Sequence, residues 1–88
     1  MDRLTQSIEI LSIMVSVRQV KAARALLAWS QFDLAKASGV SVPTVARLEA
    51  NDGELGGRSE TAEKIRTALE KAGAEFTNGK RPGVRLKS

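Results

Sequence analysis

Apolar residues recur at intervals of three and four positions in four segments of the chain, the spacing that gathers them on one face of an α-helix. The pattern predicts helices over residues 17–27, 31–38, 42–50 and 59–72. Their expected inner faces are formed by Val20, Ala23, Leu27, Leu34, Ala35, Val45, Leu48, Ala62, Ile65, Leu69 and Ala72. Arg18, Lys21 and Arg24 lie on the other side of the first helix, where we expect them to point to solvent.

The ends of these segments carry residues that favour helix termini. The candidates at the N-terminal ends are Ser16, Ser30, Ser41 and Ser59, and the glycines that end two of the helices are Gly39 and Gly73. Gln19 follows Ser16 at the spacing of a capping box. Gly39 is expected to take a left-handed backbone conformation, because a new helix follows it almost at once. Residues 51–57 have the composition of a loop, with Leu55 as its expected apolar plug.

Beyond the fourth helix the pattern changes to the alternation of β-strands. Residues 75–77 and 84–87 are strand-like, and Asn78-Gly79 and Pro82-Gly83 are turn signals between them. A two-stranded hairpin alone is marginally stable in water, so this one must pack on the helices or pair with another chain. Pairing across a dimer axis is the arrangement that we favour.

The first fifteen residues are compatible with a helix or a strand. Leu4, Ile8, Leu11 and Val15 have helical spacing, whereas many apolar residues in this region are β-branched, as in a strand. The apolar stretch of residues 8–17 is too short to span a bilayer, and neighbouring acidic residues argue against an export signal. We therefore expect no membrane association.

Composition narrows the range of functions. The 88 residues suffice for one modest core, and the absence of histidine and cysteine excludes zinc fingers, disulfides and catalysis by either residue. We expect a protein that is not an enzyme, needs no cofactor and resides in the reducing cytoplasm. The net charge of +4 does not by itself indicate DNA binding, because residues 1–75 are neutral. The excess lies entirely in Lys80, Arg81, Arg85 and Lys87.

The segment QFDLAKASGVSVPTVARLE, residues 31–49, has the spacing of two short helices that cross at a steep angle. Ala35 is small enough for the close contact between them, Gly39 permits the tight turn, and Val40 fills its corner. Both helices are expected to be attached to the core by Leu34, Val45 and Leu48. This geometry leaves the second helix exposed enough to enter a major groove of DNA.

The same residues resemble the Xre, or lambda-repressor-like, helix-turn-helix family, whose pattern is Q-x-x-L-A-x-x-x-G-V-S-x-x-T-[IV]-x-x-[LIF]-E. Every fixed position is present, and the resemblance extends over about residues 17–72. It implies an all-α, lambda-repressor-like bundle of four to five helices, here followed by a short C-terminal β-hairpin. We expect three parts: an N-terminal extension (1–15), a helix-turn-helix DNA-binding domain (16–73) and a hairpin with a basic tail (74–88). The resemblance covers neither terminus, and the N-terminal extension is the alternative to the hairpin as the dimer contact.

The resemblance implies that the third helix reads bases. The candidate base-contacting residues are Val42, Pro43, Thr44 and Arg47. Arg47 is the expected principal reader, because a guanidinium can donate two hydrogen bonds to guanine; pairing with a phosphate or a nearby carboxylate is the alternative. Val42 and Pro43 lack such donors, so contact with thymine methyl groups is their expected role.

Around that helix, the candidate phosphate-contacting residues are Gln31, Lys36, Ser41, Asn51 and Arg58. Gln31 resembles the family's phosphate-contacting glutamine, with capping as the alternative. Pro43 disfavours a helical backbone at Val42, so we expect the helix to begin at Pro43 and Ser41 to contact phosphate rather than cap the helix. Trp29 is expected to pack in the core or hinge rather than to stack on bases.

The expected partner is double-stranded DNA with a pseudo-palindromic operator, bound by a homodimer whose recognition helices lie about 34 Å apart. Regulation of transcription, as a repressor, is the expected role. The alternative is an antitoxin or antiactivator, an interaction module whose main partner is another protein and whose apolar surface is formed by residues 8–17.

Overall fold

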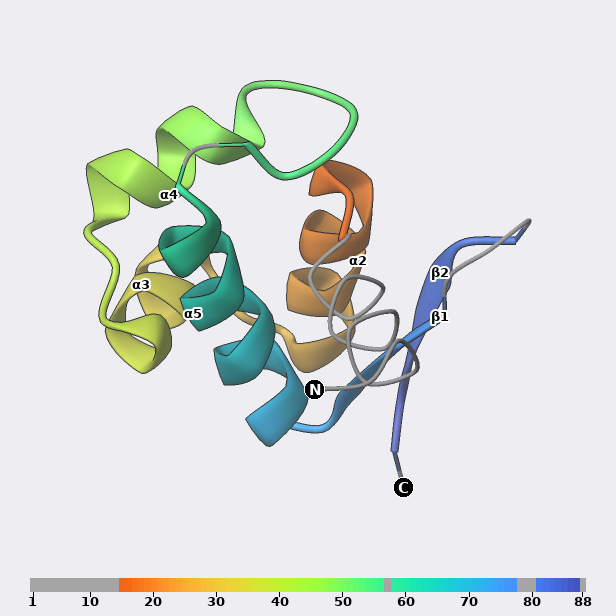
Figure 1. The fold of residues 1–88 in the computed structure, drawn as a ribbon. Coiled ribbons are helices and arrows are strands. Elements are labelled where there is room, and N and C mark those ends of the chain that lie inside the picture. The colour runs from red at the N-terminus through yellow and green to blue at the C-terminus, as the bar shows by residue number, and fades with distance from the viewer. Residues whose placement is uncertain (1–14, 57, 78–80, 88) are drawn as a thin grey trace, which may run out of the picture.

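The computed structural model describes residues 15–56, 58–77 and 81–87, and within them it contains four helices followed by an antiparallel hairpin (Figure 1). The elements are α2 (Val17–Leu27), α3 (Gln31–Ser38), α4 (Val42–Glu49), α5 (Ser59–Lys71), β1 (Ala74–Thr77) and β2 (Gly83–Leu86). The predicted helical bundle with a C-terminal hairpin is confirmed. The choice between helix and strand for residues 1–14, the Asn78-Gly79 turn and Lys80 lie outside the described residues.

The helix ends follow from local side-chain chemistry. The Ser16 hydroxyl accepts a hydrogen bond from the Gln19 N–H (3.0 Å), and the Gln19 side chain accepts one from the Ser16 N–H (2.9 Å), which completes the predicted capping box. Ser30 and Asp33 form the same reciprocal pair at the start of α3. Gly39 ends α3 with φ of +76°, the left-handed conformation expected of it.

The core is built around α5, with α3 and α4 on one side of it and α2 on the other (Figure 1). The largest fully buried side chains are Leu34, Ile65, Leu69, Val17, Val20 and Val45. The expected inner face of α5 is wrong at one position: Ala72 is exposed, and Ala68 is buried in its place. The helix ends at Lys71, so Ala72 belongs to the turn that follows, whereas the small side chain of Ala68 lies in the contact between α5 and α3.

The hairpin lies alongside α2 (Figure 1). Its register pairs Ala74 with Leu86, Glu75 with Arg85, Phe76 with Val84 and Thr77 with Gly83. The buried Gln19 amide of α2 donates to the backbone oxygens of Thr77 (2.9 Å) and Gly83 (3.0 Å), so it holds both strands at once. The hairpin therefore packs on helices of its own chain, and pairing with a second chain across a dimer axis stays a prediction.

The loop after α4 is joined to the segment before α2. The Val17 N–H donates to the Gly53 oxygen (2.8 Å), and the Leu55 N–H donates to the Val15 oxygen (3.0 Å). Leu55 packs against the core as predicted, and Val15 and Val17 are buried. Two members of the apolar stretch 8–17 thus belong to the core, and its residues 8–14 lie outside the described ones. In the described parts of the chain, no helix is long and apolar enough to cross a membrane.

Candidate nucleic-acid interface

The helix-turn-helix consists of α3, a three-residue connection and α4. Its connection depends on the residues identified from the sequence: Gly39 is left-handed, Val40 is buried in the corner, and Ala35 is buried on the side of α3 that meets the turn. Because Leu34 and Val45 are completely buried, both helices are firmly attached to the core. The mutual placement of α3 and α4 is therefore set by apolar packing.

The start of α4 differs from the prediction. Ser41 is extended, and its hydroxyl accepts a hydrogen bond from the Thr44 N–H (3.3 Å), so Ser41 is the N-cap after all. The helix begins at Val42, and Pro43 is its second residue. Pro43 is tolerated there because N–H groups in the first turn have no partner inside the helix. The cap outweighs the steric bias of Pro43 on the residue before it.

α4 has an inner side and an outer side of different chemistry. Val45, Leu48 and Glu49 are buried. Of the predicted base-contacting residues, Val42, Pro43 and Arg47 are exposed, whereas Thr44 is half-buried. The Ser41 hydroxyl donates to the Thr44 hydroxyl (2.8 Å), which ties the Thr44 side chain to the cap. Val42, Pro43 and Arg47 therefore form the accessible part of the predicted reading surface.

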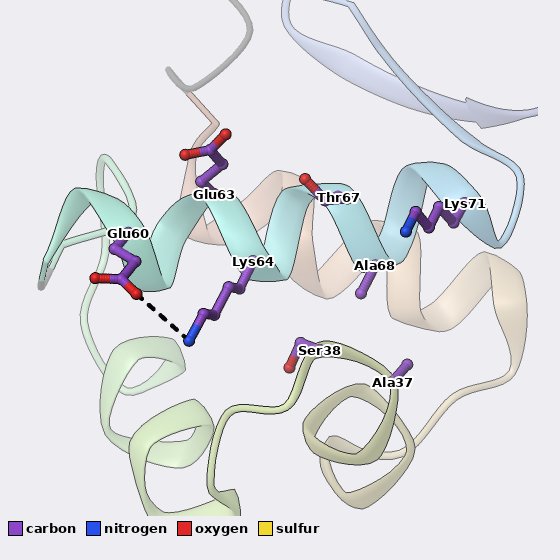
Figure 2. A pocket seen from close by; sticks show the side chains of 8 residues that line it. All are labelled: Ala37, Ser38, Glu60, Glu63, Lys64, Thr67, Ala68 and Lys71. Atoms are coloured by element: carbon purple, nitrogen blue, oxygen red, sulfur yellow. Dashed lines mark ion pairs between the residues drawn. The ribbon is translucent and has the colours of Figure 1, made fainter.

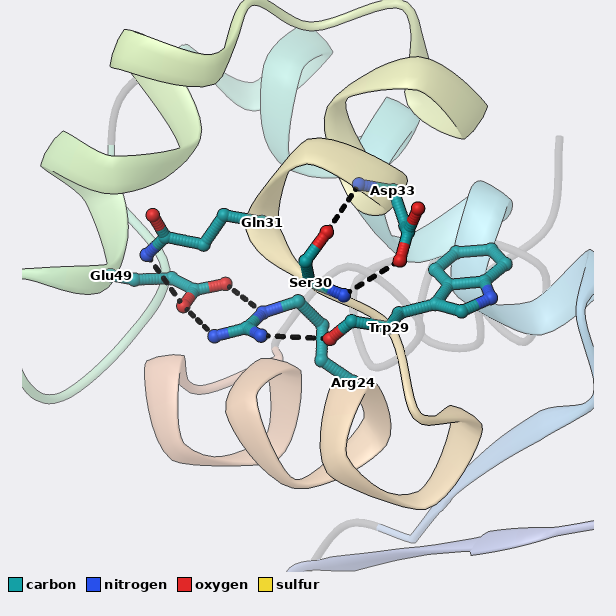
Figure 3. A network of polar contacts seen from close by, with 6 residues as sticks. All are labelled: Arg24, Trp29, Ser30, Gln31, Asp33 and Glu49. Carbon is teal, nitrogen blue, oxygen red and sulfur yellow. Dashed lines mark hydrogen bonds and ion pairs between the residues drawn. The ribbon is translucent and has the colours of Figure 1, made fainter.

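Glu49 is the centre of a polar network beneath α4 (Figure 3). Arg24 of α2 donates to both of its carboxylate oxygens, from Nε to Oε2 (2.8 Å) and from Nη2 to Oε1 (2.5 Å). Arg24 also donates to the Trp29 backbone oxygen (3.0 Å), and Gln31 donates to Glu49 Oε1 (3.2 Å). The expectation that Arg24 points to solvent is therefore wrong, because its long side chain reaches across to the buried carboxylate. Trp29 packs against the core, as expected.

The network keeps Glu49 ionised inside the protein. Burial by itself raises the pKa of its carboxyl, but hydrogen bonds from Arg24 and Gln31 outweigh this effect, and the pKa lies below its usual value. The same ion pair raises the pKa of Arg24, chiefly through the hydrogen bond to Glu49. Arg47 and Glu49 are the two charged residues of α4. Because the Glu49 carboxylate is turned inward and its charge is balanced by Arg24, the outer side of α4 is positive.

The predicted phosphate-contacting residues lie at several points around α4. Lys36 on α3, Asn51 after α4, and Arg58 at the start of α5 are exposed. Asn51 donates to the Arg47 backbone oxygen (3.2 Å). The Gln31 side chain is directed toward Glu49. Its hydrogen bond to Glu49 uses one of the two amide hydrogens of Gln31 and leaves the other for a further acceptor.

The Arg24–Glu49 ion pair is a functional feature that the sequence analysis did not predict. A signal was present, because Glu49 follows Val45 by four positions and therefore belongs to the inner stripe of its helix. A carboxylate on a buried stripe requires a cation nearby. The partner could not be identified, because the contact between residues 24 and 49 depends on how α2 crosses α4.

A hollow of about 370 Å³ lies between α3 and α5, and its lining lacks the uniform positive charge of the outer side of α4 (Figure 2). It is lined by Ala37, Ser38, Glu60, Glu63, Lys64, Thr67, Ala68 and Lys71. Its charges are mixed, and Lys64 is paired with Glu60 (3.6 Å), so it is a poor match for the uniformly negative backbone of DNA. Within the described residues, no group of three or more acidic side chains is placed to hold a metal ion.

Comparison with protein families agrees with this geometry. Residues 20–76 match the model of a helix-turn-helix family of the Cro/C1 type, a range that includes all of α3, α4 and α5. A comparison with curated proteins finds no match. The matched range is more than half of the chain and contains the whole helix-turn-helix described above. The chain therefore belongs to the Xre-like, Cro/C1-type helix-turn-helix family of DNA-binding regulators.

Proposed function

We propose that this regulator binds a specific duplex site as a homodimer, inserts α4 into the major groove and represses the promoter that the site overlaps. The observation that carries the proposal is the division of charge on α4. Its carboxylate is buried and neutralised by Arg24, while its guanidinium is exposed. The outer side of α4 thus offers a cation to DNA without a nearby acid on the same helix to repel the phosphates.

Arg47 is the proposed principal base reader. Among the described residues, no carboxylate lies within ion-pair distance of it. Its fork of donors is thus available for the O6 and N7 atoms of guanine, a contact that contributes roughly 1–3 kcal/mol of discrimination. Thr44 is tied to the helix cap, so we expect it to contribute less than Arg47.

Positioning on the DNA backbone is assigned to the residues that surround α4. The proposed phosphate contacts are the side chains of Gln31, Lys36, Asn51 and Arg58. The Ser41 side chain is not among them, because its hydroxyl caps α4 and donates its hydrogen to Thr44. Such contacts carry no sequence information, but they set the register and orientation of the reading helix. Each phosphate that is neutralised should add about 0.9 to the slope of log affinity against log salt concentration.

The homodimer is proposed to form along the outer edge of β2. Among the described residues, β2 pairs with β1 alone, so its other edge has no strand beside it. The Lys87 N–H donates to the Gly73 oxygen (2.8 Å), and in this register the backbone groups of Val84 and Leu86 point to that open edge. Leu86 is also one of the exposed large apolar residues. Antiparallel pairing of two β2 strands across a twofold axis would cover both features.

In this scheme the helical segment 16–73 binds DNA and the hairpin segment 74–88 joins the two protomers. A dimer bound across a promoter sterically excludes RNA polymerase, so repression is its direct consequence. The alternative as an antitoxin or antiactivator rested on residues 8–17, of which Val15 and Val17 are buried. No described surface favours that alternative over DNA binding.

Selection of binding sites from a random duplex pool tests the proposal. We expect an enriched pseudo-palindrome with half-sites about one helical turn apart. Arg47→Ala should weaken binding roughly 5- to 150-fold for each half-site, which corresponds to 1–3 kcal/mol per contact, and should lose the preference at one base pair in each half-site. The control is Arg18→Ala, which removes an exposed guanidinium of α2 that is paired with Asp52 and should bind normally. Failure to enrich any sequence would refute specific recognition.

Two further measurements test the dimer and the repression. Sedimentation equilibrium should give a dimer for the wild-type chain and a monomer for Leu86→Glu; an enriched site that is not palindromic and binds one chain would exclude the dimer. Transcription in vitro from a promoter that overlaps the selected site should fall as the protein is added, and an increase would exclude repression.

A further inference from the structure

An apolar hollow lies where α3 meets the first turn of α4. It is formed chiefly by Phe32, Ala35, Lys36, Val40 and Val42. Phe32 is 63% exposed and Val42 is 38% exposed, which makes them two of the four exposed large apolar residues in the described parts of the chain. Residues of this kind that share one hollow form an apolar patch, and such patches on small proteins commonly mark a binding surface.

The charge around the hollow suits DNA. Lys36 is the one charged residue in its lining, and no carboxylate lines it. Asp33, the acidic residue nearest in sequence, accepts a hydrogen bond from the Ser30 N–H at the start of the helix (2.8 Å). A cation beside an apolar surface matches the edge of a major groove, where a phosphate and a base lie next to each other.

The hollow is also continuous with the reading helix, because Val42 belongs to both. In the orientation that the family uses, the start of the recognition helix faces the base edges. The apolar group that a base pair presents in the major groove is the 5-methyl of thymine. Duplex DNA with a thymine at this position is therefore the occupant that the chemistry fits.

We propose that Phe32 of α3 is a specificity-determining residue, and that its ring and the Val42 side chain hold one thymine methyl group between them. Lys36 contacts the adjacent phosphate. The inference rests on the proposed function and adds to it a residue outside the recognition helix. It predicts that the selected operator carries a thymine in each half-site opposite the start of α4.

The test removes the methyl group and the ring separately and together. Each thymine of the selected site is replaced in turn by deoxyuracil in both half-sites, and affinities are measured by fluorescence anisotropy. When the thymine that contacts Phe32 and Val42 is replaced by deoxyuracil, the affinity of the wild-type protein should fall about fourfold per half-site, the value expected for the loss of one buried methyl group. Phe32→Ala should bind the thymine site more weakly by a similar factor and should no longer distinguish thymine from uracil there. Phe32→Leu, which keeps an apolar side chain, should retain part of the preference.

Leu26→Ala is the matched control, because Leu26 is an exposed apolar residue of α2 (47%) outside the hollow. It should behave as the wild type with both DNAs. The inference is overturned if Phe32→Ala keeps the wild-type loss on removal of the methyl, if Phe32→Ala binds as tightly as the wild type, or if the operator lacks the thymine. In each of these outcomes sequence-specific binding itself still stands. If no sequence is enriched at all, the proposed function fails, and the inference fails with it.

Discussion

Removal of Arg24 should destabilise the protein far more than removal of an exposed arginine that makes an equivalent ion pair. The Glu49 side chain is 3% exposed and that of Arg24 is 19% exposed. Arg24→Ala leaves a buried carboxylate with Gln31 as its remaining hydrogen-bond donor among those identified. Loss of one partner of a buried pair costs about 3–5 kcal/mol, and partial hydration of the site places the expected loss near 3 kcal/mol.

That loss is large for a chain of this size. Domains are stabilised by about 0.05–0.15 kcal/mol per residue, which is roughly 4–13 kcal/mol here. A loss of 3 kcal/mol should lower Tm by about 12–24 °C. Glu49→Ala should cost less, roughly 2 kcal/mol, because the guanidinium keeps its bond to the Trp29 oxygen and some access to water. Replacement of both residues, as Arg24→Met with Glu49→Leu, should restore most of the stability.

The pH dependence identifies the cause. In the wild type the pKa of Glu49 is lowered by folding, so its stabilising contribution is present at neutral pH and is lost as pH falls through the folded pKa. In Arg24→Ala, burial is no longer opposed by Arg24, and the folded pKa should rise above the unfolded value of about 4.3. Protonation then relieves the buried charge, so the stability difference between the two proteins should narrow from pH 7 to about pH 4.

Urea denaturation followed by circular dichroism measures these differences. The control is Arg18→Ala, whose bidentate pair with Asp52 joins exposed side chains and should contribute little to stability. The reasoning is refuted if Arg24→Ala is no less stable than Arg18→Ala, or if the deficit of Arg24→Ala is the same at both pH values.

Four other substitutions test separate features of the fold and of the proposed DNA contacts. Gly39→Ala should lower the free energy of unfolding by about 1–2 kcal/mol in urea denaturation. The cause is backbone strain at φ of +76°, because no atom lies near enough for a steric clash. Ala28→Gly, at φ of +56°, should instead raise the free energy of unfolding by about 0.5–1 kcal/mol, and two changes of equal sign would contradict the argument. Gln19→Ala should release the hairpin from α2. Relative to the wild type, amide hydrogen exchange should then accelerate more in β1 and β2 than in α5, and an equal acceleration everywhere would contradict this prediction. Lys36→Gln should lower the salt slope of DNA binding by about 1 for each protomer, or about 2 for the dimer, and should leave the selected consensus unchanged. An altered consensus would exclude a phosphate contact.

Local features of the fold were predictable because each depends on residues close together in the chain. The capping box at Ser16, the left-handed Gly39 and the hairpin all follow from the order of a few residues. The error at Ala72 has a similar explanation, since the helical repeat was extended by one residue past the point where the helix ends. Helix ends are where periodicity is least informative.

The features that were missed depend on contacts between distant elements. Arg24 was placed in solvent because its own helix gives no indication of Glu49 on α4. Gln19 was identified as half of a capping box, and nothing near it in the sequence indicated its second role in binding Thr77 and Gly83. Phe32 was not identified as part of a surface, because its apolar neighbours Val40 and Val42 reach it across the turn. A polar or aromatic side chain thus acquires such a role only when the helices are assembled.

The two sides of α4 have consequences for how such a regulator can diverge. Val45, Leu48 and Glu49 are committed to the core and to Arg24, whereas Pro43 and Arg47 make no contact on which the core depends. Substitutions at exposed positions of this kind usually change stability by less than about 0.5 kcal/mol. A duplicated copy of the gene could therefore acquire a new operator through a few changes on the outer side of one helix while folding as before. The same separation makes α4 a suitable place to design regulators that act in one cell without cross-talk.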